Sequence, residues 1–237
     1  ARPGMGKTSF CLNIGTNVAI STKKTVCMFS LEMSAEQLVS RVISSEAMVD
    51  SYALRTGKLD SKQWDDIAGA TSKLAGCDIL IDDTSGITVT GMKAKLRRVS
   101  GLGLVVIDYL GLIRPAGKTE NRVQAVSEIT RELKLMAKDL AIPVICCAQL
   151  SRGTEGRGSS HRPQLADLRE SGSIEQDADI VMFIHRPDKI ATPQEIASGA
   201  VEKDVAEIII EKNRSGERGV VKLLFKGEYS KFVNITS

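Results

Sequence analysis

The chain has 237 residues, of which 42% are hydrophobic and 26% are charged, as expected of a soluble globular protein with a sizeable core. The formal net charge is only +3, so any contact with nucleic acid must come from local clusters of Lys and Arg rather than from global basicity. No apolar run reaches the ~18 residues of a membrane span and no signal peptide is recognisable, so we expect a cytoplasmic protein with no membrane partner.

The cysteine and histidine content argues against a zinc site. The chain contains no C-x-x-C pair and only two histidines, whereas zinc sites draw on such residues at short, regular spacings. The cysteines fall mostly within apolar runs, which favours reduced thiols in the core. The cysteines are Cys11, Cys27, Cys77, Cys146 and Cys147, and the histidines are His161 and His185.

Short apolar runs alternate with amphipathic stretches over residues 1–150, a pattern typical of a parallel sheet with helical crossovers. In the first helix we expect Phe10, Ile14 and Val18 to share one face. Ser34 is the expected N-cap of the second helix, with Gln37 completing a capping box. The predicted elements are helices over 7–20, 34–49, 61–74, 89–99 and 122–140, and strands over 25–30, 78–81, 104–107 and 144–148.

The pattern changes after Leu150. Residues 151–163 are rich in Gly, Ser and Arg and predict a mobile loop, and 187–204 form a second polar insert. A strand is predicted over 180–185, followed by antiparallel strands over 205–211, 220–225 and 232–235. We find no repeat and no linker, so we expect one α/β domain over 1–237.

A candidate phosphate-binding loop opens the chain. The consensus G-x-x-x-x-G-K-[ST] is matched at Gly6, Lys7 and Thr8, whereas Ala1 stands where the first glycine belongs. In such a loop, backbone N–H groups surround the phosphates, the lysine contacts the β- and γ-phosphates and the hydroxyl binds Mg²⁺. The alternative is an ordinary glycine-rich helix entry. The candidate loop comprises Ala1, Arg2, Pro3, Gly4, Met5, Gly6, Lys7, Thr8 and Ser9.

The position of this loop predicts a truncated domain. A phosphate-binding loop follows a strand and opens a helix, and the chain begins at the loop itself. We therefore expect that the first strand of the domain, and anything before it, is missing.

Three polar residues follow predicted strands. Asp108 ends the apolar strand 104–107, where a nucleotide-bound Mg²⁺ needs an anchor; the alternative is an Asp that caps a turn. Glu32 could orient and deprotonate an attacking water, or be a solvated residue leading into the next helix. Gln149 could sense the γ-phosphate through its amide, or be merely a polar residue at a strand end.

Two further segments carry charge. Lys212 and Arg214 lie at a hairpin tip; Arg214 could act as an arginine finger on a neighbouring subunit's nucleotide, or the tip could be a basic solvated turn. The segment 167–176 could follow a nucleic-acid backbone through Arg169 and main-chain N–H groups. It is poor in aromatic residues, so base stacking is not its mode, and the alternative is a capped helix start.

Several motifs follow one another along the chain. They are Arg2-Pro3-x-Met5-Gly6-Lys7-Thr8, Phe29-Ser30-Leu31-Glu32-Met33-Ser34, Ile107-Asp108-Tyr109-Leu110, Gln149-Leu150, Asp167-Leu168-Arg169-Glu170-Ser171-Gly172-Ser173-Ile174-Glu175-Gln176-Asp177-Ala178-Asp179 and Lys212-Asn213-Arg214-Ser215-Gly216. In this order they resemble the C-terminal motor domain of the DnaB-type replicative DNA helicases, over nearly the whole chain. The phosphate loop alone is weakly diagnostic, whereas the second and fifth motifs are far more specific.

The resemblance implies a RecA-like P-loop NTPase fold, in which a mostly parallel sheet is flanked by helices and antiparallel strands lie at the C-terminal end. It implies a homohexameric ring that binds ATP and Mg²⁺ between subunits. It further implies 5′-to-3′ movement on single-stranded DNA at replication forks, with a primase and a helicase loader as partners.

The resemblance also implies roles for individual residues. Lys7 and Thr8 bind phosphate and Mg²⁺, Glu32 is the catalytic base, and Asp108 holds the water shell of the metal. Gln149 is the sensor that joins the nucleotide to the DNA loop. The remaining implied residues are Arg41 near the nucleotide, Lys212 and Arg214 reaching in trans, and Arg169, Glu170 and Gly172 contacting DNA in the pore.

The chain departs from the family pattern at Gly4, Gly111 and His185, which suggests a divergent member encoded by a phage or prophage. None of these changes touches a catalytic group. We do not find the N-terminal helical domain of the family or its linker helix, which holds one subunit to the next, so we expect ring assembly by this segment alone to be impaired.

Three other functions remain as alternatives. A RecA-like recombinase or a clock-type ATPase would share the phosphate loop and Asp108, but would not predict the second and fifth motifs. A non-catalytic nucleotide- and DNA-binding ring component would have no need of Glu32 or Arg214. A metabolite kinase is the most remote, because the sequence offers no acceptor pocket.

Overall fold

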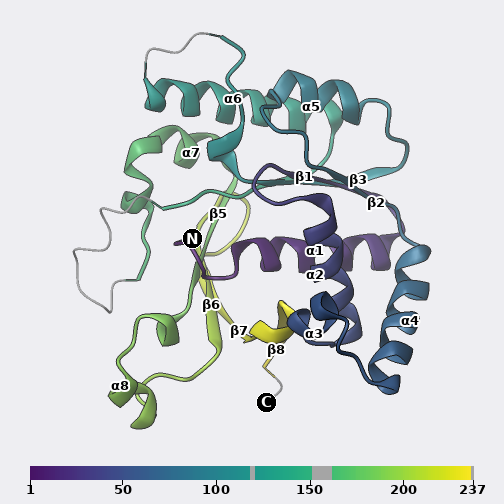
Figure 1. Ribbon diagram of the computed structural model, residues 1–237. Coiled ribbons are helices and arrows are strands. Elements are labelled where there is room, and N and C mark those ends of the chain that lie inside the picture. Colours follow the sequence, from purple (N-terminus) through teal and green to yellow (C-terminus); the bar gives the residue numbers. More distant parts are fainter. Residues whose placement is uncertain (118–120, 151–161, 236–237) are drawn as a thin grey trace.

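The computed structural model describes residues 1–117, 121–150 and 162–235 (Figure 1). Four parallel strands form one sheet in the order β2-β1-β3-β4. Because the strands are parallel, their carboxyl ends lie at one edge of the sheet. The strands are β1 (Thr25–Ser30), β2 (Ile79–Asp82), β3 (Leu102–Asp108) and β4 (Val144–Cys146).

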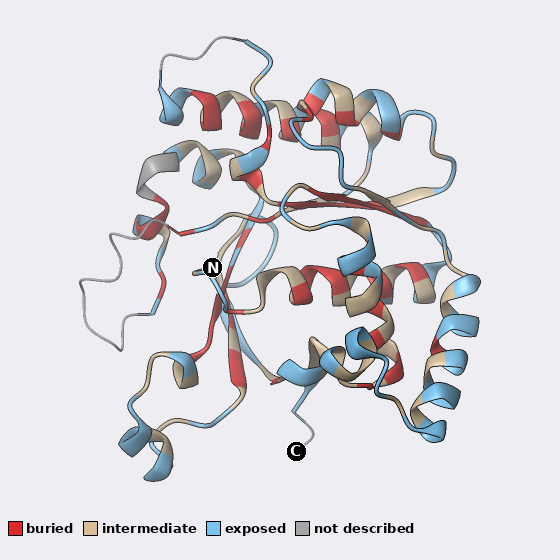
Figure 2. Ribbon diagram, in the orientation of Figure 1, coloured by how far each residue is buried: buried red, intermediate tan, exposed pale blue. Residues whose placement is uncertain are grey.

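Helices cover both faces of this sheet, with α1 and α2 on one side and α5 and α6 on the other (Figure 1). Side chains alternate between the two cores: Val26 and Met28 of β1 pack with α1 and α2, whereas Cys27 and Phe29 pack with α5 and α6. Figure 2 shows β1 and β3 as largely buried, as expected for strands covered on both faces. These helices are α1 (Lys7–Thr22), α2 (Ala35–Ala47), α5 (Val89–Leu96) and α6 (Arg122–Leu140).

Local signals in the sequence explain where two of these helices begin. The Ser34 hydroxyl accepts a hydrogen bond from the Gln37 N–H while the Gln37 side chain accepts one from the Ser34 N–H, so the predicted capping box is confirmed. Asn121 caps α6 through the N–H of Gln124. The apolar stripe of α6, including Ile129 and Met136, is buried against the sheet as its spacing predicts.

The three apolar residues expected to share one face of α1 are not the most buried residues of that helix. Phe10, Ile14 and Val18 are partly buried, and Ile14 and Val18 pack against the core between α1 and the sheet. The most buried positions of the helix are Ser9, Cys11, Leu12, Gly15, Thr16 and Ala19. A Cβ atom at Gly15 would lie 2.2 Å from Cε of Met28, so this close approach needs glycine. Phe10 packs instead against Phe232, with ring centroids 5.4 Å apart.

The C-terminal third forms a second sheet, antiparallel throughout, in the order β5-β6-β7-β8. Two short helices, η3 and α7, lead into β5, and α8 lies in the insert between β5 and β6 (Figure 1). The strands are β5 (Ile180–His185), β6 (Val205–Asn213), β7 (Gly219–Lys226) and β8 (Lys231–Asn234). The short helices are η3 (Leu165–Ser171), α7 (Gly172–Asp177), η4 (Pro187–Lys189), α8 (Pro193–Ala197) and η5 (Gly227–Tyr229).

The strands and helices predicted from the pattern occur where expected, with small differences at their ends. The helix predicted over 89–99 ends at Leu96, because Arg98 and Val99 donate to carbonyls only three residues back and so form a tighter turn. The strand predicted over 144–148 ends at Cys146, and the next carbonyl, of Cys147, accepts from the N–H of Leu110.

Some elements were missed or lie outside the described residues. The sequence pattern gave no sign of α3 (Ser51–Thr56), η1 (Leu110–Leu112) or the short helices between β5 and β6. The third predicted helix is α4 (Ser61–Ala75), which packs against α2. Residues 151–161 of the predicted mobile loop lie outside the described residues. Among the described helices, none has both the length and the apolar character that crossing a membrane requires.

Candidate functional site

The phosphate-binding loop leads directly into α1. Gly4 and Gly6 have φ angles of 75° and 92°, in the left-handed region that favours glycine. Gly6 is the N-cap residue of α1, and among the described side chains none caps this end of the helix. The N–H groups of the first turn therefore point toward an anion-binding position, as at other helix N-termini that bind phosphate.

Asp108 lies at the carboxyl end of β3 and contacts the first two residues of α1. The Lys7 ammonium is 2.8 Å from Oδ1 of Asp108, and the Thr8 hydroxyl donates to Oδ2 at 2.5 Å. Burial by itself would lower the pKa of Lys7, but the hydrogen bond and the charge of Asp108 outweigh it and raise that pKa. Lys7 therefore stays cationic, and its ammonium also lies 4.4 Å from the centre of the Tyr109 ring.

These residues suit a nucleotide with its Mg²⁺. A hydroxyl and a carboxylate held together are the oxygen ligands that Mg²⁺ takes in phosphate-loop proteins. Thr8 supplies the hydroxyl and Asp108 supplies the carboxylate, and the two groups are hydrogen-bonded to each other. The cation at Lys7 and the uncapped start of α1 complement the phosphate charge.

Glu32 and Gln149 lie at the same edge of the sheet as Asp108. Glu32 follows β1 and Gln149 follows β4, and β3 pairs with both of these strands. The N–H of Leu31 donates to the Asp108 carbonyl at 2.8 Å, which holds the chain beside Glu32 against the end of β3. Both side chains are exposed, and the charge of Glu32 contributes to the raised pKa of Lys7. The three polar residues that were predicted to follow strands therefore lie at one edge of the sheet, within one chain.

Lys212 and Arg214 lie elsewhere, at the end of β6. A guanidinium N–H of Arg214 donates to the Gln176 carbonyl at 2.8 Å, and its other terminal nitrogen is 3.5 Å from Oδ1 of Asp179. The Lys212 ammonium donates to the Glu175 carbonyl. Among the described contacts, neither cation touches the phosphate loop or Asp108 of its own chain.

The predicted DNA-contacting segment, residues 167–176, contacts these cations through its last two residues, Glu175 and Gln176, which are 37 and 38 residues away along the chain. Residues 165–171 form η3, and Gly172, which is exposed, begins α7. Helix α7 therefore joins the predicted DNA contacts to the carbonyls that hold Lys212 and Arg214.

A model of the family described as DnaB-like helicase C terminal domain matches residues 1–234. The chain belongs to this family. It is 50% identical over 99% of its length to the replicative DNA helicase DnaC of Bacillus subtilis (strain 168) and to the replicative DNA helicase DnaB of Geobacillus stearothermophilus. The chain spans about half the length of these relatives, 51% in each case.

Solved structures agree with this assignment. One solved structure, described as an ATPase domain, superposes with a TM-score of 0.90 at 36% identity, covering 99% of this chain and 82% of that one. A DnaB-like replicative helicase, described with its interactions with primase, superposes with a TM-score of 0.89 at 35% identity, over 99% and 56% of the two chains. The RadB recombinase, at 15% identity and a TM-score of 0.57, shares the fold alone. The predicted RecA-like α/β fold and the predicted DnaB-type resemblance are both confirmed.

The other predicted nucleotide contacts of this DnaB-like domain lie around the loop in different environments. The side chain of Met5 is buried against Ile184 and Ile208, and Ser9 is buried as well, so these two could reach a phosphate only through their backbone N–H groups. Ala1 is bonded through its carbonyl to the N–H of Leu150.

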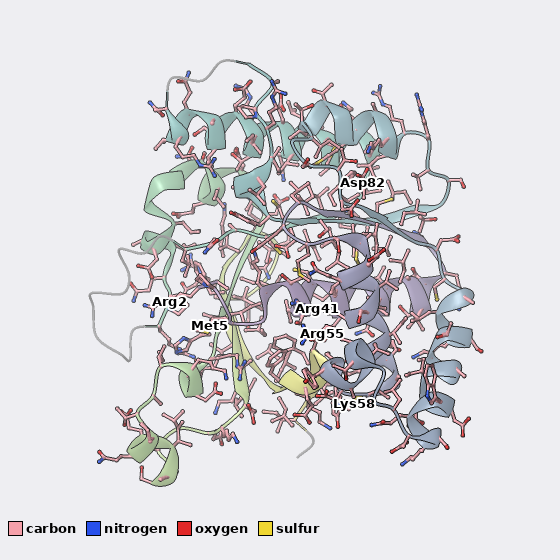
Figure 3. All side chains as sticks on the ribbon, viewed as in Figure 1. Arg2, Met5, Arg41, Arg55, Lys58 and Asp82 are labelled. Atoms are coloured by element: carbon pink, nitrogen blue, oxygen red, sulfur yellow. The ribbon has the colours of Figure 1, made fainter. Side chains whose placement is uncertain are left out.

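Arg41, also predicted near the nucleotide, lies on α2. Figure 3 draws Arg41 below the parallel sheet, on the side covered by α1, with Arg55 of α3 nearby in the view and Asp82 at the level of the sheet. In the same view, Arg2 and Met5 lie to the left, at the phosphate loop. Arg55 lies on α3, a helix that the sequence pattern did not predict, and its guanidinium is 5.5 Å from the centre of the Tyr52 ring.

Two residues around Arg214 were not identified from the sequence. Asp179 contacts both Arg214 and Lys134, and Lys134 comes from the middle of α6. Asp179 ends the fifth motif, directly before β5, so its position at a strand end could have marked it. Lys134 carries no such signal, because it is one of several charged residues on the amphipathic helix α6 and lies 45 residues before Asp179 in the chain.

Proposed function

We propose that residues 1–237 act as one ATP-hydrolysing motor unit of a 5′-to-3′ replicative DNA helicase, working in a homohexameric ring on single-stranded DNA. The observation that carries this proposal is the division of the charged groups. Lys7, Thr8 and Asp108 meet within one chain, whereas Arg214 projects from the other sheet, half exposed. Such a division favours a site completed by a neighbouring copy. Family membership supports the same function.

The residues at the sheet edge have distinct tasks in this proposal. Lys7 and the backbone of residues 1–9 would bind the phosphates, Thr8 and Asp108 would hold Mg²⁺, and Arg41 would lie near the nucleotide. When bound, Mg²⁺ neutralises charge that develops on the phosphoryl oxygens. Glu32 orients the attacking water and accepts its proton on a carboxylate oxygen.

Arg214, with Lys212, stabilises the transition-state charge in the neighbouring subunit's site. The Gln149 amide follows β4 directly before Leu150, so a change at the phosphates can pass to the chain that leads on to the DNA segment. Arg169, Glu170 and Gly172 contact the DNA backbone. Because these contacts are to phosphates, binding is independent of sequence and weakens as salt rises.

The partners follow from the same proposal. A ring that unwinds DNA at a fork works with a primase and must be placed on DNA by a loader. One structural neighbour is described with its primase interactions, which supports the first of these partners for the present chain.

The test is ATP hydrolysis with and without single-stranded DNA, at several protein concentrations. Turnover should rise with DNA and with concentration, and both Glu32→Ala and Arg214→Ala should abolish it. Mixing the two variants should restore part of the activity, since mixed rings rebuild some complete sites. The matched controls are Glu36→Ala and Arg218→Ala, which remove exposed residues of the same type from the same neighbourhood. DNA-independent turnover that survives Arg214→Ala would overturn the shared site.

A further inference from the structure

The carboxyl end of α7 holds both cations of the β6 hairpin. The Glu175 carbonyl accepts from Lys212 and the Gln176 carbonyl accepts from Arg214. Carbonyls in the last turn of a helix lack partners within the helix, so they favour basic side chains. The backbone adds a third contact, since the N–H of Arg214 donates to the Asp179 carbonyl at 3.0 Å.

The Asp179 carboxylate is shared between two cations. Oδ1 is 3.5 Å from the Arg214 guanidinium, and Oδ2 accepts from the Lys134 ammonium of α6. The hydrogen bond from Lys134, with the charges of Lys134, Arg214 and Lys212, holds the pKa of Asp179 below its ordinary value. Asp179 is therefore ionised at neutral pH and attracts Arg214 continuously.

This arrangement makes Arg214 easy to release. The side chains of Arg214 and Asp179 are 52% and 55% exposed, so their attraction is screened by water and weak. When Arg214 leaves, Lys134 still neutralises Asp179, and no unpaired charge is left behind. Lys134, bound at Oδ2, also competes with Arg214 at Oδ1 for the negative charge of the carboxylate, so it weakens the hold on Arg214.

We propose that Asp179 is a positioning residue that holds Arg214 on its own subunit's α7, in competition with the phosphates of the neighbouring subunit's nucleotide. The proposal rests on the proposed function, because it takes Arg214 to act in trans. Helix α7 lies against α6 and follows η3 directly (Figure 1). DNA bound near Gly172 would shift α7 and, with it, the carbonyls of Glu175 and Gln176, which links DNA binding in one subunit to hydrolysis in the next.

The test uses two variants with opposite expected signs, in the ring-forming protein. Asp179→Asn removes the charge that holds Arg214, so DNA-free ATP turnover should rise about two- to five-fold, the rate equivalent of one exposed ion pair, and stimulation by DNA should fall. Lys134→Met removes the competitor, so DNA-free turnover should fall and stimulation by DNA should rise. A merely structural role would move both variants in the same direction.

The matched control is Asp139→Asn. Asp139 also lies on α6 and pairs with Lys93 on the protein surface, away from the hairpin, so DNA-free turnover and DNA stimulation should stay at the parent values. Hydrogen exchange at the Arg214 amide gives a second readout that needs no ring, and it should be faster in Asp179→Asn and slower in Lys134→Met. If Asp179→Asn does not fold, Lys134→Met decides by its sign alone.

Arg214→Ala in the same assay separates the two proposals. If it leaves turnover intact, the shared site is wrong, and the exchange rates alone decide whether Asp179 holds Arg214. If Arg214→Ala abolishes turnover while the other two variants shift together or not at all, the holding role of Asp179 is overturned and the shared site stands.

Discussion

The charged side chains at the two sheets of this domain differ in how far they are buried and how closely they are paired. At the edge of the parallel sheet, the side chains of Lys7 and Asp108 are only 16% and 9% exposed and touch each other. On the antiparallel sheet, Arg214 and Asp179 are more than half exposed and 3.5 Å apart. The first arrangement is preorganised, since a ligand meets groups already in place. The second keeps a cation where another molecule can reach it.

The difference indicates which half of the site one chain can supply. The phosphate loop and the Asp108 carboxylate are positioned by helices and strands that pack together within one chain. They therefore need no second subunit to come together. Arg214 lies at a hairpin end, held by carbonyls and a screened carboxylate. We infer that nucleotide binding belongs to one subunit and turnover to two.

The largest expected effect tests this inference directly. Lys7→Ala should weaken binding of a fluorescent ATP analogue to the isolated chain, because it removes the cation that complements the phosphates. Arg214→Ala should leave that binding unchanged while lowering turnover in the ring by about 10³-fold, as for other arginine fingers. If the two variants weakened binding equally in the isolated chain, the result would contradict the inference that Arg214 serves turnover and not nucleotide binding.

The antiparallel sheet also contains a buried ion pair, which gives the next effect. Arg186 is 3% exposed, its guanidinium lies 3.0 Å from a carboxylate oxygen of Asp188, and it stacks 4.6 Å from the centre of the Phe225 ring. Arg186→Met should cost about 3 kcal/mol in urea unfolding, because it leaves a buried carboxylate unpaired. The double variant with Asp188→Asn should recover part of the loss. A loss below about 1 kcal/mol would show that the pair is solvated.

The contact between Lys7 and Asp108 could be predicted from the sequence more fully than the burial of Arg186. Lys7, Thr8 and Asp108 follow from a loop consensus and from an apolar strand that ends in a carboxylate, and both signals are local. The sequence showed Arg186 only as the residue after a strand, with no sign that it would be buried. Its partner ring, on β7, lies far along the chain, and only the fold brings the two together.

The same limit applies to α1 and to α7. The spacing of Phe10, Ile14 and Val18 predicted a shared face, but it gave no sign of the close approach at Gly15, which is recognisable as a contact only once Met28 is placed. The network of Lys134 and Asp179 joins separate elements in the same way. Periodic elements were therefore predictable, whereas contacts between them were not.

The phosphate loop touches the second sheet, and a glycine marks the contact. A Cβ atom at Gly6 would lie 2.9 Å from Cζ of Phe232, at a φ of +92°. Gly6→Ala should cost about 2 kcal/mol in urea unfolding, from left-handed strain and crowding together. Gly57→Ala is the control, since its φ is +70° and no atom lies within 4 Å of the added Cβ; it should cost about 1 kcal/mol. Equal losses would mean that the ring of Phe232 moves aside freely.

The smallest expected effect concerns Glu46, which joins α2 to the second sheet. Its carboxylate is 2.7 Å from the Lys73 ammonium of α4 and 3.5 Å from the Lys231 ammonium of β8. Burial alone would raise the pKa of Glu46, but the hydrogen bond from Lys73 and the charges of both lysines outweigh it, so the pKa is lowered.

A lowered pKa in the folded state means that the stabilisation is complete above the ordinary glutamate pKa and is lost as pH falls through the folded-state value. Glu46→Gln should therefore cost about 1 kcal/mol at pH 7, and its difference from the parent should shrink as pH falls from about 5 to about 3. Urea unfolding at each pH measures this, with the exposed Glu217→Gln as control. A difference that stays constant with pH would assign the loss to packing rather than to charge. In that case packing, and not charge, would account for the stabilising contact between Glu46 of α2 and Lys231 of β8.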